Sequence, residues 1–543
     1  MWASDQSNSV PGQEKLGIKG SFLWIWDSDD IETQLAGGPD ATPIGCEPGT
    51  TGPCDLIDLF PQDLVESTSG TQLKDLSGFG RLHGVIKDPQ QRYVNANIFA
   101  PGGGYIGVID TRTKEAVALF RATEFNGARS VHMSFWNKDG SAIIVGNLNG
   151  KAIERINVER DPDGIITQLS FDKSATLGLG KAQSVTADAA VFTGVNAHGN
   201  PLIGQTIGDY LNADLSDFTP NSVCKENGCD GGANDGDKGG RGANLPICSI
   251  PSMDNDLTYI TLAGGGLFVV DASQTPLKIV GEYGKEVIYG AGCGGVQAKG
   301  KMHVNSGVSA SGLGADQSMF AVWQLDDEDY LGPTMNPQNE PLPAVVFEDE
   351  DNTATGGNLV GVPSDPSGQI PGQTTRRDSH GTAATVDESY VHVVDRVQNV
   401  VESFDVESFK RVTYDLTSKS GKNGLTGQPG ACAAKSVLDD ENLPINDPAP
   451  DLSETTPDGK YLMIAFRGPA PVSVPHSAQG SCPGVGVVEL LPNGKGGRLV
   501  GVLRSTNTVV DAVVITDASF PGGIAYSGAE RSDVHGAIVV SKV

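Results

Sequence analysis

The stretch His132-Met-Ser-Phe-Trp-Asn-Lys-Asp139-Gly-Ser-Ala-Ile-Ile-Val145 has a counterpart in the same chain, His380-Gly-Thr-Ala-Ala-Thr-Val-Asp387-Glu-Ser-Tyr390-Val. The two segments align without a gap over 27 positions, 132–158 and 380–406. Each begins with a histidine, reaches an Asp-containing turn, and continues into short runs of β-branched and apolar residues. An internal repeat of this kind predicts a fold assembled from copies of one β unit.

Other parts of the chain follow the same spacing. His83 stands ten residues before Tyr93, as His380 stands ten residues before Tyr390. Asp451 takes the place of the histidine in a further copy. Near the C-terminus, the sequence Asp533-Val-His535-Gly repeats the signature Asp378-Ser-His380-Gly. The repeated position therefore holds a histidine in four copies and an aspartate in a fifth.

We count seven units, each with a first strand, a turn, a strongly apolar second strand, and a third strand that ends near Asp. The second strands are expected to begin near Tyr93, Ala142, Tyr259, Phe320, Tyr390 and Tyr461. In the seventh unit, His535-Gly-Ala-Ile-Val-Val would share a sheet with Phe22-Leu-Trp-Ile-Trp. Pairing of the two chain ends closes a ring and hides its sheet edges. The sequence thus predicts an all-β fold, a seven-bladed β-propeller closed by N- and C-terminal strands.

The composition agrees with this fold, because the chain has 71 glycines and 32 prolines among 543 residues and few long helical patterns. We expect a single propeller domain over residues 1–543. Long loop insertions without periodicity are expected at about 31–75, 160–245, 328–376 and 415–450.

The formal net charge of −29 argues against nucleic acid or an anionic membrane surface as a partner. No stretch approaches the roughly 20 apolar residues that a membrane span needs. The acidity suits a soluble protein or an encounter with a basic partner. The sequence leaves the formation of a homodimer open.

The eight cysteines form no Cys-x-x-Cys motif, and most stand in Gly- and Pro-rich segments. Disulfides in an oxidising compartment are therefore favoured over metal thiolates, which predicts a periplasmic or secreted protein. Cys46 with Cys54 and Cys224 with Cys229 are the expected local pairs.

In a propeller, a residue at the start of the innermost strand points toward the mouth of the central channel. His83, His132, His380 and His535 should therefore converge, with Asp451 at the same level. Two further histidines are expected to face the same mouth from insertions, and the predicted metal ligands are His83, His132, His198, His380, His476 and His535. The predicted catalytic carboxylates are Glu286 and Asp451. His303 could also reach the mouth, whereas His392 is interpreted as structural.

Several imidazoles with few thiolates suit copper, zinc, iron or nickel, and their number favours more than one ion, copper first. Asp378 and Asp533 each stand two residues before a ring histidine and are expected to orient its imidazole. The segment 227–240 could hold calcium through Asp230, Asp235 and Asp237. The alternatives left open are a calcium- or zinc-dependent propeller hydrolase, a non-catalytic propeller that binds protein or another ligand, and histidines that only support the blades.

The histidine ring of His83, His132, His198, His380, His476 and His535, on a seven-bladed propeller, resembles the copper propellers, namely thiocyanate dehydrogenase and the N-terminal domain of nitrous oxide reductase. Thiocyanate dehydrogenase is the closer resemblance, because that family consists of a propeller and little else. The resemblance implies a centre of several copper ions with nearby carboxylates, which Glu286 matches, and a lysine that has no match here. It also implies two-electron oxidation of a small anionic substrate, thiocyanate, to cyanate and sulfur, with electrons passing to an acceptor such as a cytochrome c.

Overall fold

The computed structural model describes residues 1–6, 21–61, 63–66, 80–99, 103–180, 184–203, 244–285, 287–290, 292–306, 320–333, 340–348, 377–396, 399–416, 448–468, 480, 482–507 and 532–541. Within these residues the fold is almost entirely β. The α-helix that they contain, α1 (Ser28–Leu35), lies outside the sheets. None of their helices is both long and apolar enough to cross a membrane.

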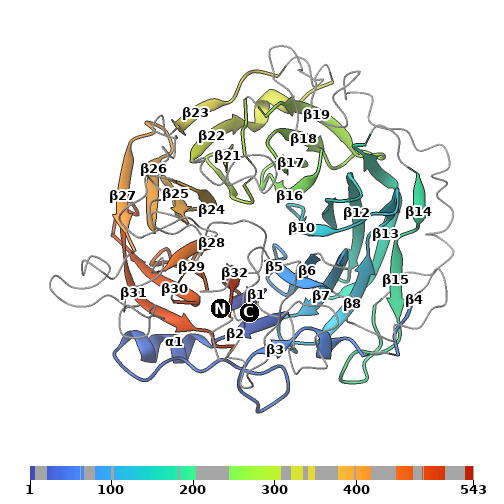
Figure 1. Ribbon diagram of the computed structural model, residues 1–543, viewed down its shortest axis with the longest axis horizontal. Coiled ribbons are helices and arrows are strands. Elements are labelled where there is room, and N and C mark those ends of the chain that lie inside the picture. The colour runs from blue at the N-terminus through green and yellow to red at the C-terminus, as the bar shows by residue number, and fades with distance from the viewer. Residues whose placement is uncertain are drawn as a thin grey trace, which may run out of the picture.

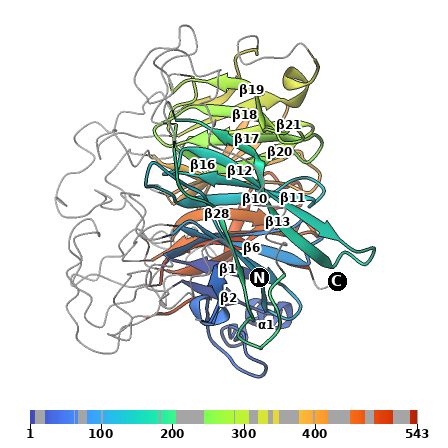
Figure 2. The ribbon, with the colours of Figure 1, turned by 90° about the vertical axis from the view of Figure 1, so that its right-hand side faces the viewer.

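Seven sheets stand around a central axis as the blades of a propeller (Figure 1). Strands that follow one another in a blade pair antiparallel, as β5 to β8 do. Inner strands of neighbouring blades contact one another around the axis. Seen from the side, the blades form one layer (Figure 2). The seven-bladed β-propeller predicted from the repeat is confirmed.

Each blade has an inner, a second, a third and an outer strand, counted from the axis outward. The inner strands are β5 (Arg81–Lys87), β10 (Val131–Trp136), β16 (Pro246–Pro251), β20 (Gly295–Ala298), β24 (Ser379–Ala384), β28 (Ala449–Thr455) and β32 (Val534–Ile538). The second strands are β6 (Tyr93–Phe99), β11 (Ala142–Asn147), β17 (Leu257–Leu262), β21 (Lys301–Asn305), β25 (Tyr390–Asp395), β29 (Tyr461–Arg467) and β1 (Trp2–Asp5). The third strands are β7 (Tyr105–Asp110), β12 (Ala152–Arg160), β18 (Leu267–Asp271), β22 (Ala321–Asp326), β26 (Val400–Asp405), β30 (Gly484–Leu490) and β2 (Phe22–Ile25). The outer strands are β8 (Ala116–Arg121), β13 (Ile166–Gly178), β19 (Lys278–Tyr283), β23 (Ala344–Glu348), β27 (Arg411–Asp415), β31 (Gly497–Arg504) and β3 (Cys54–Asp55).

A few elements lie outside this pattern. β15 (Ala190–Thr193) and β4 (Val65–Glu66) extend the outer edge of the β5–β8 blade, and β9 (Glu124–Phe125) pairs with β14 (Val185–Ala187). Two short 3-10 helices, η2 (Ile57–Leu59) and η5 (Asp327–Tyr330), follow β3 and β22.

The repeated aspartates build the turns between inner and second strands. In three blades, the carboxylates of Asp139, Asp387 and Asp458 each accept a hydrogen bond from the backbone N–H two residues later, at Ser141, Ser389 and Lys460. A short polar side chain that binds its own backbone in this way favours a tight turn. This local chemistry explains why the repeat keeps an Asp seven residues after the inner-strand position.

The closing blade contains strands from both ends of the chain. β1 pairs with β2 on one side and with β32 on the other, so the sheet order is β3-β2-β1-β32. The N- and C-termini lie close together as a result (Figure 1). The predicted pairing of chain ends is confirmed, with one addition: residues Trp2–Asp5 supply a strand between the two segments that the repeat identified.

Two sequence predictions about the blades were wrong. A second strand was expected to begin near Phe320, but the strand that follows Phe320 is β22, the third strand of its blade. The second strand is β21, which pairs with both β20 and β22. The segments expected to be loops at 31–75, 160–245 and 328–376 contain the outer strands β3, β13 and β23. An outer strand has one neighbour and can stay partly exposed, as β23 does, so its apolar pattern is weak. Most of 415–450 lies outside the described residues.

Candidate metal centre

The repeated histidine or aspartate lies at a β-bulge of the inner strand in five blades. In β5, the pairing register shifts between Leu82 and Gly84, which leaves His83 as an extra residue. Similar register shifts enclose His132 in β10, His380 in β24, Asp451 in β28 and His535 in β32. A β-bulge bends the strand and re-aims the side chain at that point. The bulges thus give these five residues a common orientation that regular alternation would not provide.

The four imidazoles from these bulges lie together at the axis. The ring centre of His83 is 3.9 Å from that of His132 and 4.0 Å from that of His535. The rings of His380 and His535 are 5.4 Å apart. The structure therefore brings together four of the six predicted ligands; that they bind a metal remains a prediction.

Asp451 joins the imidazoles to a buried ionic network. Its Oδ1 lies 2.5 Å from His380 Nδ1 and 3.9 Å from His535 Nε2. Its Oδ2 accepts a hydrogen bond of 2.8 Å from Arg467 Nη1. Neither Asp451 nor Arg467 is exposed to solvent. A proton on His380 Nδ1 would face the carboxylate, and Nε2 would then be available to a ligand.

Asp378 and Asp533 act one step further from the imidazoles than the sequence predicts. Asp533 accepts two hydrogen bonds from Arg467, of 2.5 and 2.6 Å, and Asp378 accepts one of 2.8 Å from Arg396. The two guanidinium groups in turn face Asp451, at 2.8 Å from Arg467 and 3.9 Å from Arg396. The aspartates therefore position arginines, and the arginines position Asp451.

Burial keeps the imidazoles of His132, His380 and His535 neutral. Loss of solvent, with a smaller contribution from His380, lowers the pKa of His132 to about 3, although an edge of this side chain stays exposed. Burial also lowers the pKa of His380 and of His535. Burial alone would raise the pKa of Asp451, but the contact with His380 and the charge of Arg396 hold it well below its usual value. Neutral imidazoles beside a carboxylate are the forms in which these groups bind metal ions.

His535 shows most directly that the cluster fits a metal ion. The side chain is fully buried, and neither ring nitrogen has a hydrogen-bond partner among the described residues. A buried polar group left in this state costs about 1–3 kcal/mol, so it calls for a functional explanation. A metal ion bound to one of the His535 ring nitrogens would explain why this imidazole is buried without a hydrogen bond.

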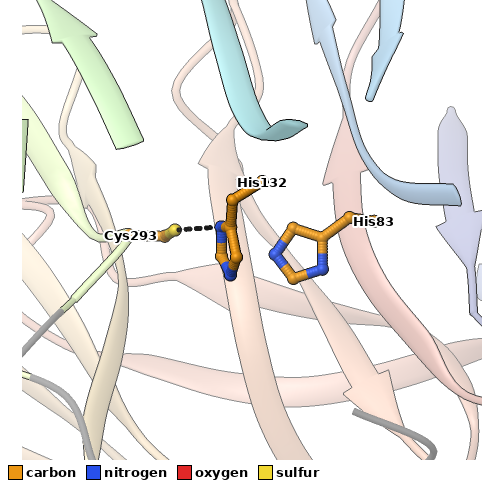
Figure 3. A group of neighbouring side chains, drawn as sticks. All are labelled: His83, His132 and Cys293. Atoms are coloured by element: carbon orange, nitrogen blue, oxygen red, sulfur yellow. Dashed lines mark hydrogen bonds between the residues drawn. The ribbon is translucent and has the colours of Figure 1, made fainter. Parts of the chain in front are cut away.

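The donor atoms fall into two neighbouring groups. His380, Asp451 and His535 form one group, and within each group the candidate atoms lie within 4.8 Å of one another. The other group consists of His83, His132 and Cys293 (Figure 3). Cys293 is bonded to Cys248, so the present donors are four imidazoles and one carboxylate. Such a set fits copper, zinc, iron or nickel and suits calcium poorly, because calcium prefers oxygen ligands.

His198 lies away from this cluster, contrary to the predicted position at the channel mouth. It follows β15, which pairs with the outer strand β8, and its Nδ1 is 3.9 Å from Glu47 Oε2. β15 and the residues that follow it, 194–203, lie along the outside of a blade instead of near the axis. His476, Glu286 and the calcium candidates Asp230, Asp235 and Asp237 lie outside the described residues.

The two remaining histidines are held within blades. His303 lies in β21, where its Nε2 is 2.9 Å from Gln324 Nε2. His392 lies in β25, and its Nδ1 is 3.1 Å from the hydroxyl of Tyr414. The structural role expected for His392 agrees with this position, and the contact of His303 supports the same role.

The disulfides match the predicted oxidising chemistry and add a feature that the sequence did not reveal. Cys46–Cys54 is confirmed, whereas Cys224 and Cys229 lie outside the described residues. Cys248–Cys293 joins the two blades that contribute neither a histidine nor an aspartate to the cluster. In β16 the bulge falls at Ile247, so Ile247 occupies the position that the ring histidines hold in other blades. Cys248 directly follows it, and the spacing of the repeat could therefore have placed this cysteine near the ring.

The centre borders an apolar channel of about 500 Å³ between the inner strands. Residues adjacent to the ring ligands line it, among them Met133, Leu452 and Gly536, and so does Cys293. Toward the turns of the blades, the wall includes Lys87, Asn137 and Val386.

The sequence matches no protein-family model and no curated protein. Several solved structures are similar in architecture. Hydrazine synthase of Kuenenia stuttgartiensis is 11% identical with a TM-score of 0.35, over 75% of this chain and 76% of that chain. The periplasmic gluconolactonase PpgL of Pseudomonas aeruginosa is 9% identical with a TM-score of 0.40, over 93% and 98%. At such scores these similarities say nothing about the activity of this protein.

Proposed function

We propose that this protein is a copper-dependent oxidoreductase that oxidises a small inorganic anion at the centre formed by the inner-strand bulges. The observation that carries the proposal is the convergence of His83, His132, His380 and His535 with Asp451. An imidazole-rich set with a single carboxylate suits copper, and the unsatisfied ring nitrogens of buried His535 support a bound cation.

Thiocyanate is the proposed substrate, on the strength of the resemblance of the histidine ring to thiocyanate dehydrogenase. The reaction is SCN⁻ + H₂O → OCN⁻ + S + 2 H⁺ + 2 e⁻, so it needs an external electron acceptor. Copper, when bound, supplies redox capacity and lowers the pKa of a coordinated water. A basic cytochrome c is the proposed acceptor, because a net charge of −29 favours docking of a cationic partner.

The residues of the chain have distinct proposed roles. His83, His132, His380 and His535 hold the metal. Asp451 fixes the orientation of His380 through the 2.5 Å contact to Nδ1, and Arg467 fixes Asp451. The channel that borders the centre has a mostly apolar wall.

A periplasmic or secreted location is part of the proposal. The Cys46–Cys54 and Cys248–Cys293 disulfides fit an oxidising compartment, and a cytochrome c acceptor would be reached there.

The test is an activity assay on copper-loaded protein with thiocyanate and oxidised cytochrome c. The expected result is reduction of two equivalents of cytochrome for each cyanate formed, with sulfur as the second product. The matched variants are His535→Ala, which removes a ring imidazole, and His392→Ala, which removes a buried imidazole outside the ring. Equal activity in both variants would contradict the proposed centre. Copper binding without thiocyanate turnover would keep the centre and reject the substrate.

A further inference from the structure

The Cys248–Cys293 disulfide stands beside the cluster and takes no part in the proposed reaction. Cys248 belongs to β16, and Cys293 lies two residues before β20. These are the inner strands of the two blades that supply neither a ring histidine nor Asp451. The sulfur atoms thus occupy the part of the axis where the ring of four histidines and Asp451 is interrupted.

The distances around Cys293 match those of a metal site. Its Sγ lies 3.6 Å from His132 Nδ1, and His132 stands between Cys293 and His83 (Figure 3). One tetrahedral ion with a sulfur at about 2.3 Å and a nitrogen at about 2.0 Å would separate the two ligands by about 3.5 Å. The present spacing therefore already suits a shared ion.

The backbone holds Cys293 in place independently of its disulfide. A Cβ on Gly292 would lie 2.2 Å from Asn305 Oδ1, and one on Gly294 would clash with the backbone oxygen of His380. The two glycines therefore let the chain pack directly against Asn305 and β24. With its neighbours fixed in this way, Cys293 Sγ should stay near His132 after the disulfide opens.

We propose that the Cys248–Cys293 disulfide is a redox-controlled part of the metal centre. Reduction by a dithiol breaks the S–S bond, gives two thiols on the protein, and oxidises the dithiol to its own disulfide. Cys293 then releases its proton to solvent and binds a metal ion as the third ligand beside His83 and His132. A site of two imidazoles and one thiolate favours softer ions such as monovalent copper or zinc more than imidazoles alone do.

The channel provides the route for the reductant. Cys293 lines the channel, whereas Cys248 is fully buried. An attacking thiolate would therefore reach Cys293 Sγ and release Cys248, and the second thiol of the dithiol would then free Cys293. The inference rests on the proposed metal centre but is independent of the substrate.

Cobalt(II) is a suitable probe, because a cobalt–thiolate bond gives a near-ultraviolet charge-transfer band that imidazole ligands do not give. Under anaerobic conditions, the Cys248→Ser variant carries Cys293 as a thiol without added reductant. We expect a thiolate band that saturates at one cobalt per chain. The band should be absent in Cys293→Ser and weakened in His132→Ala/Cys248→Ser. Cys46→Ser, which frees Cys54 away from the axis, is the control for a cysteine freed elsewhere.

A second measurement uses wild-type protein, in case Cys248→Ser does not fold. The protein is reduced with a dithiol, desalted and titrated with cobalt, and Cys248→Ser/Cys293→Ser treated in the same way gives the background. A wild-type band no stronger than this background would overturn the inference. Copper content of the oxidised protein is measured in parallel: failure to bind copper contradicts the proposed function, whereas copper binding without a thiolate band after reduction contradicts only the redox control of Cys293.

Discussion

Asp451 illustrates how single residues determine the chemistry of the centre. Its carboxylate contacts His380 on one side and Arg467 on the other, with no access to solvent. The spacing of the repeat predicted that Asp451 lies among the histidines, because Asp451 occupies in its repeat the position that a histidine occupies in four others. The register could not predict the arginine contacts of Asp378 and Asp533, since these depend on how neighbouring blades pack.

Burial of a histidine also has a consequence for stability that can be measured at a residue outside the centre. Burial lowers the pKa of His392 to about 4. An unfolded chain binds a proton at this residue below its ordinary pKa of about 6.5, so folded protein loses stability as the pH falls from 6.5 to 4. At pH 5 the loss from this residue is about 2 kcal/mol.

The prediction is that His392→Gln makes the unfolding free energy of metal-free protein less dependent on pH between 6.5 and 4. The slope should decrease by about 1.4 kcal/mol per pH unit, as measured by denaturant titration. Tyr414→Phe is the control, because it removes the hydroxyl contact but leaves His392 buried. An unchanged slope in His392→Gln would show that this imidazole does not titrate differently on folding.

At the scale of elements, the bulged inner strand is the unit that builds the centre. The sequence repeat set the spacing from the ligand position to the turn and to the second strand, and the structure follows that spacing in β10 and β24. The bulge itself could not be read from the sequence, because its signal is a backbone register between two strands. The position of His198 was predicted wrongly for a related reason: weakly patterned β15 was not recognised as a strand.

Close packing between adjacent bulges should therefore control metal binding. A Cβ on Gly381 would lie 2.8 Å from Leu452 Cα and in collision with the backbone oxygen of Asp451. Gly381→Ala should push β24 and β28 apart, weaken copper binding, and destabilise the fold by about 1–3 kcal/mol.

The control for Gly381→Ala is Gly496→Ala, where the nearest atom is Leu491 Cδ1 at 3.3 Å, the end of a side chain that can move. This variant should change the unfolding free energy by less than about 0.5 kcal/mol. For both variants, copper binding is measured as copper content and stability is measured as the midpoint of denaturant unfolding. Full copper content in Gly381→Ala would show that the two bulges need not pack closely.

For the whole molecule, ring closure is the decisive feature. The number of blades and the pairing of chain ends followed from counting repeats, since each repeat buries its apolar face against the next. The strand formed by Trp2–Asp5 has no counterpart in that count, because it belongs to the split blade. The Cys248–Cys293 disulfide could not be predicted from the repeats either, since it joins neighbouring blades across 45 residues of sequence.

A charge within the closing sheet should destabilise the whole ring. Ala3 is fully buried in β1, opposite Trp24 and Ala537. Ala3→Asp should lower the unfolding free energy by at least about 3 kcal/mol, because the carboxylate loses its hydration. Val386→Asp, at a position 60% exposed, is the control and should be close to neutral. Denaturant midpoints compare the two, and equal midpoints would argue against a closing role for β1.

The metal centre is tested most simply by the copper content of wild-type protein and of five single variants after copper loading and desalting. Four variants replace ring ligands, His83→Ala, His132→Ala, His380→Ala and His535→Ala, and His392→Ala is the control. We predict that wild-type protein and the control retain several copper ions per chain, and that each ring variant loses copper while its far-UV circular dichroism stays unchanged. Full retention of copper in all four ring variants, or no copper in the wild-type protein, would contradict the central claim that these bulges form one metal centre.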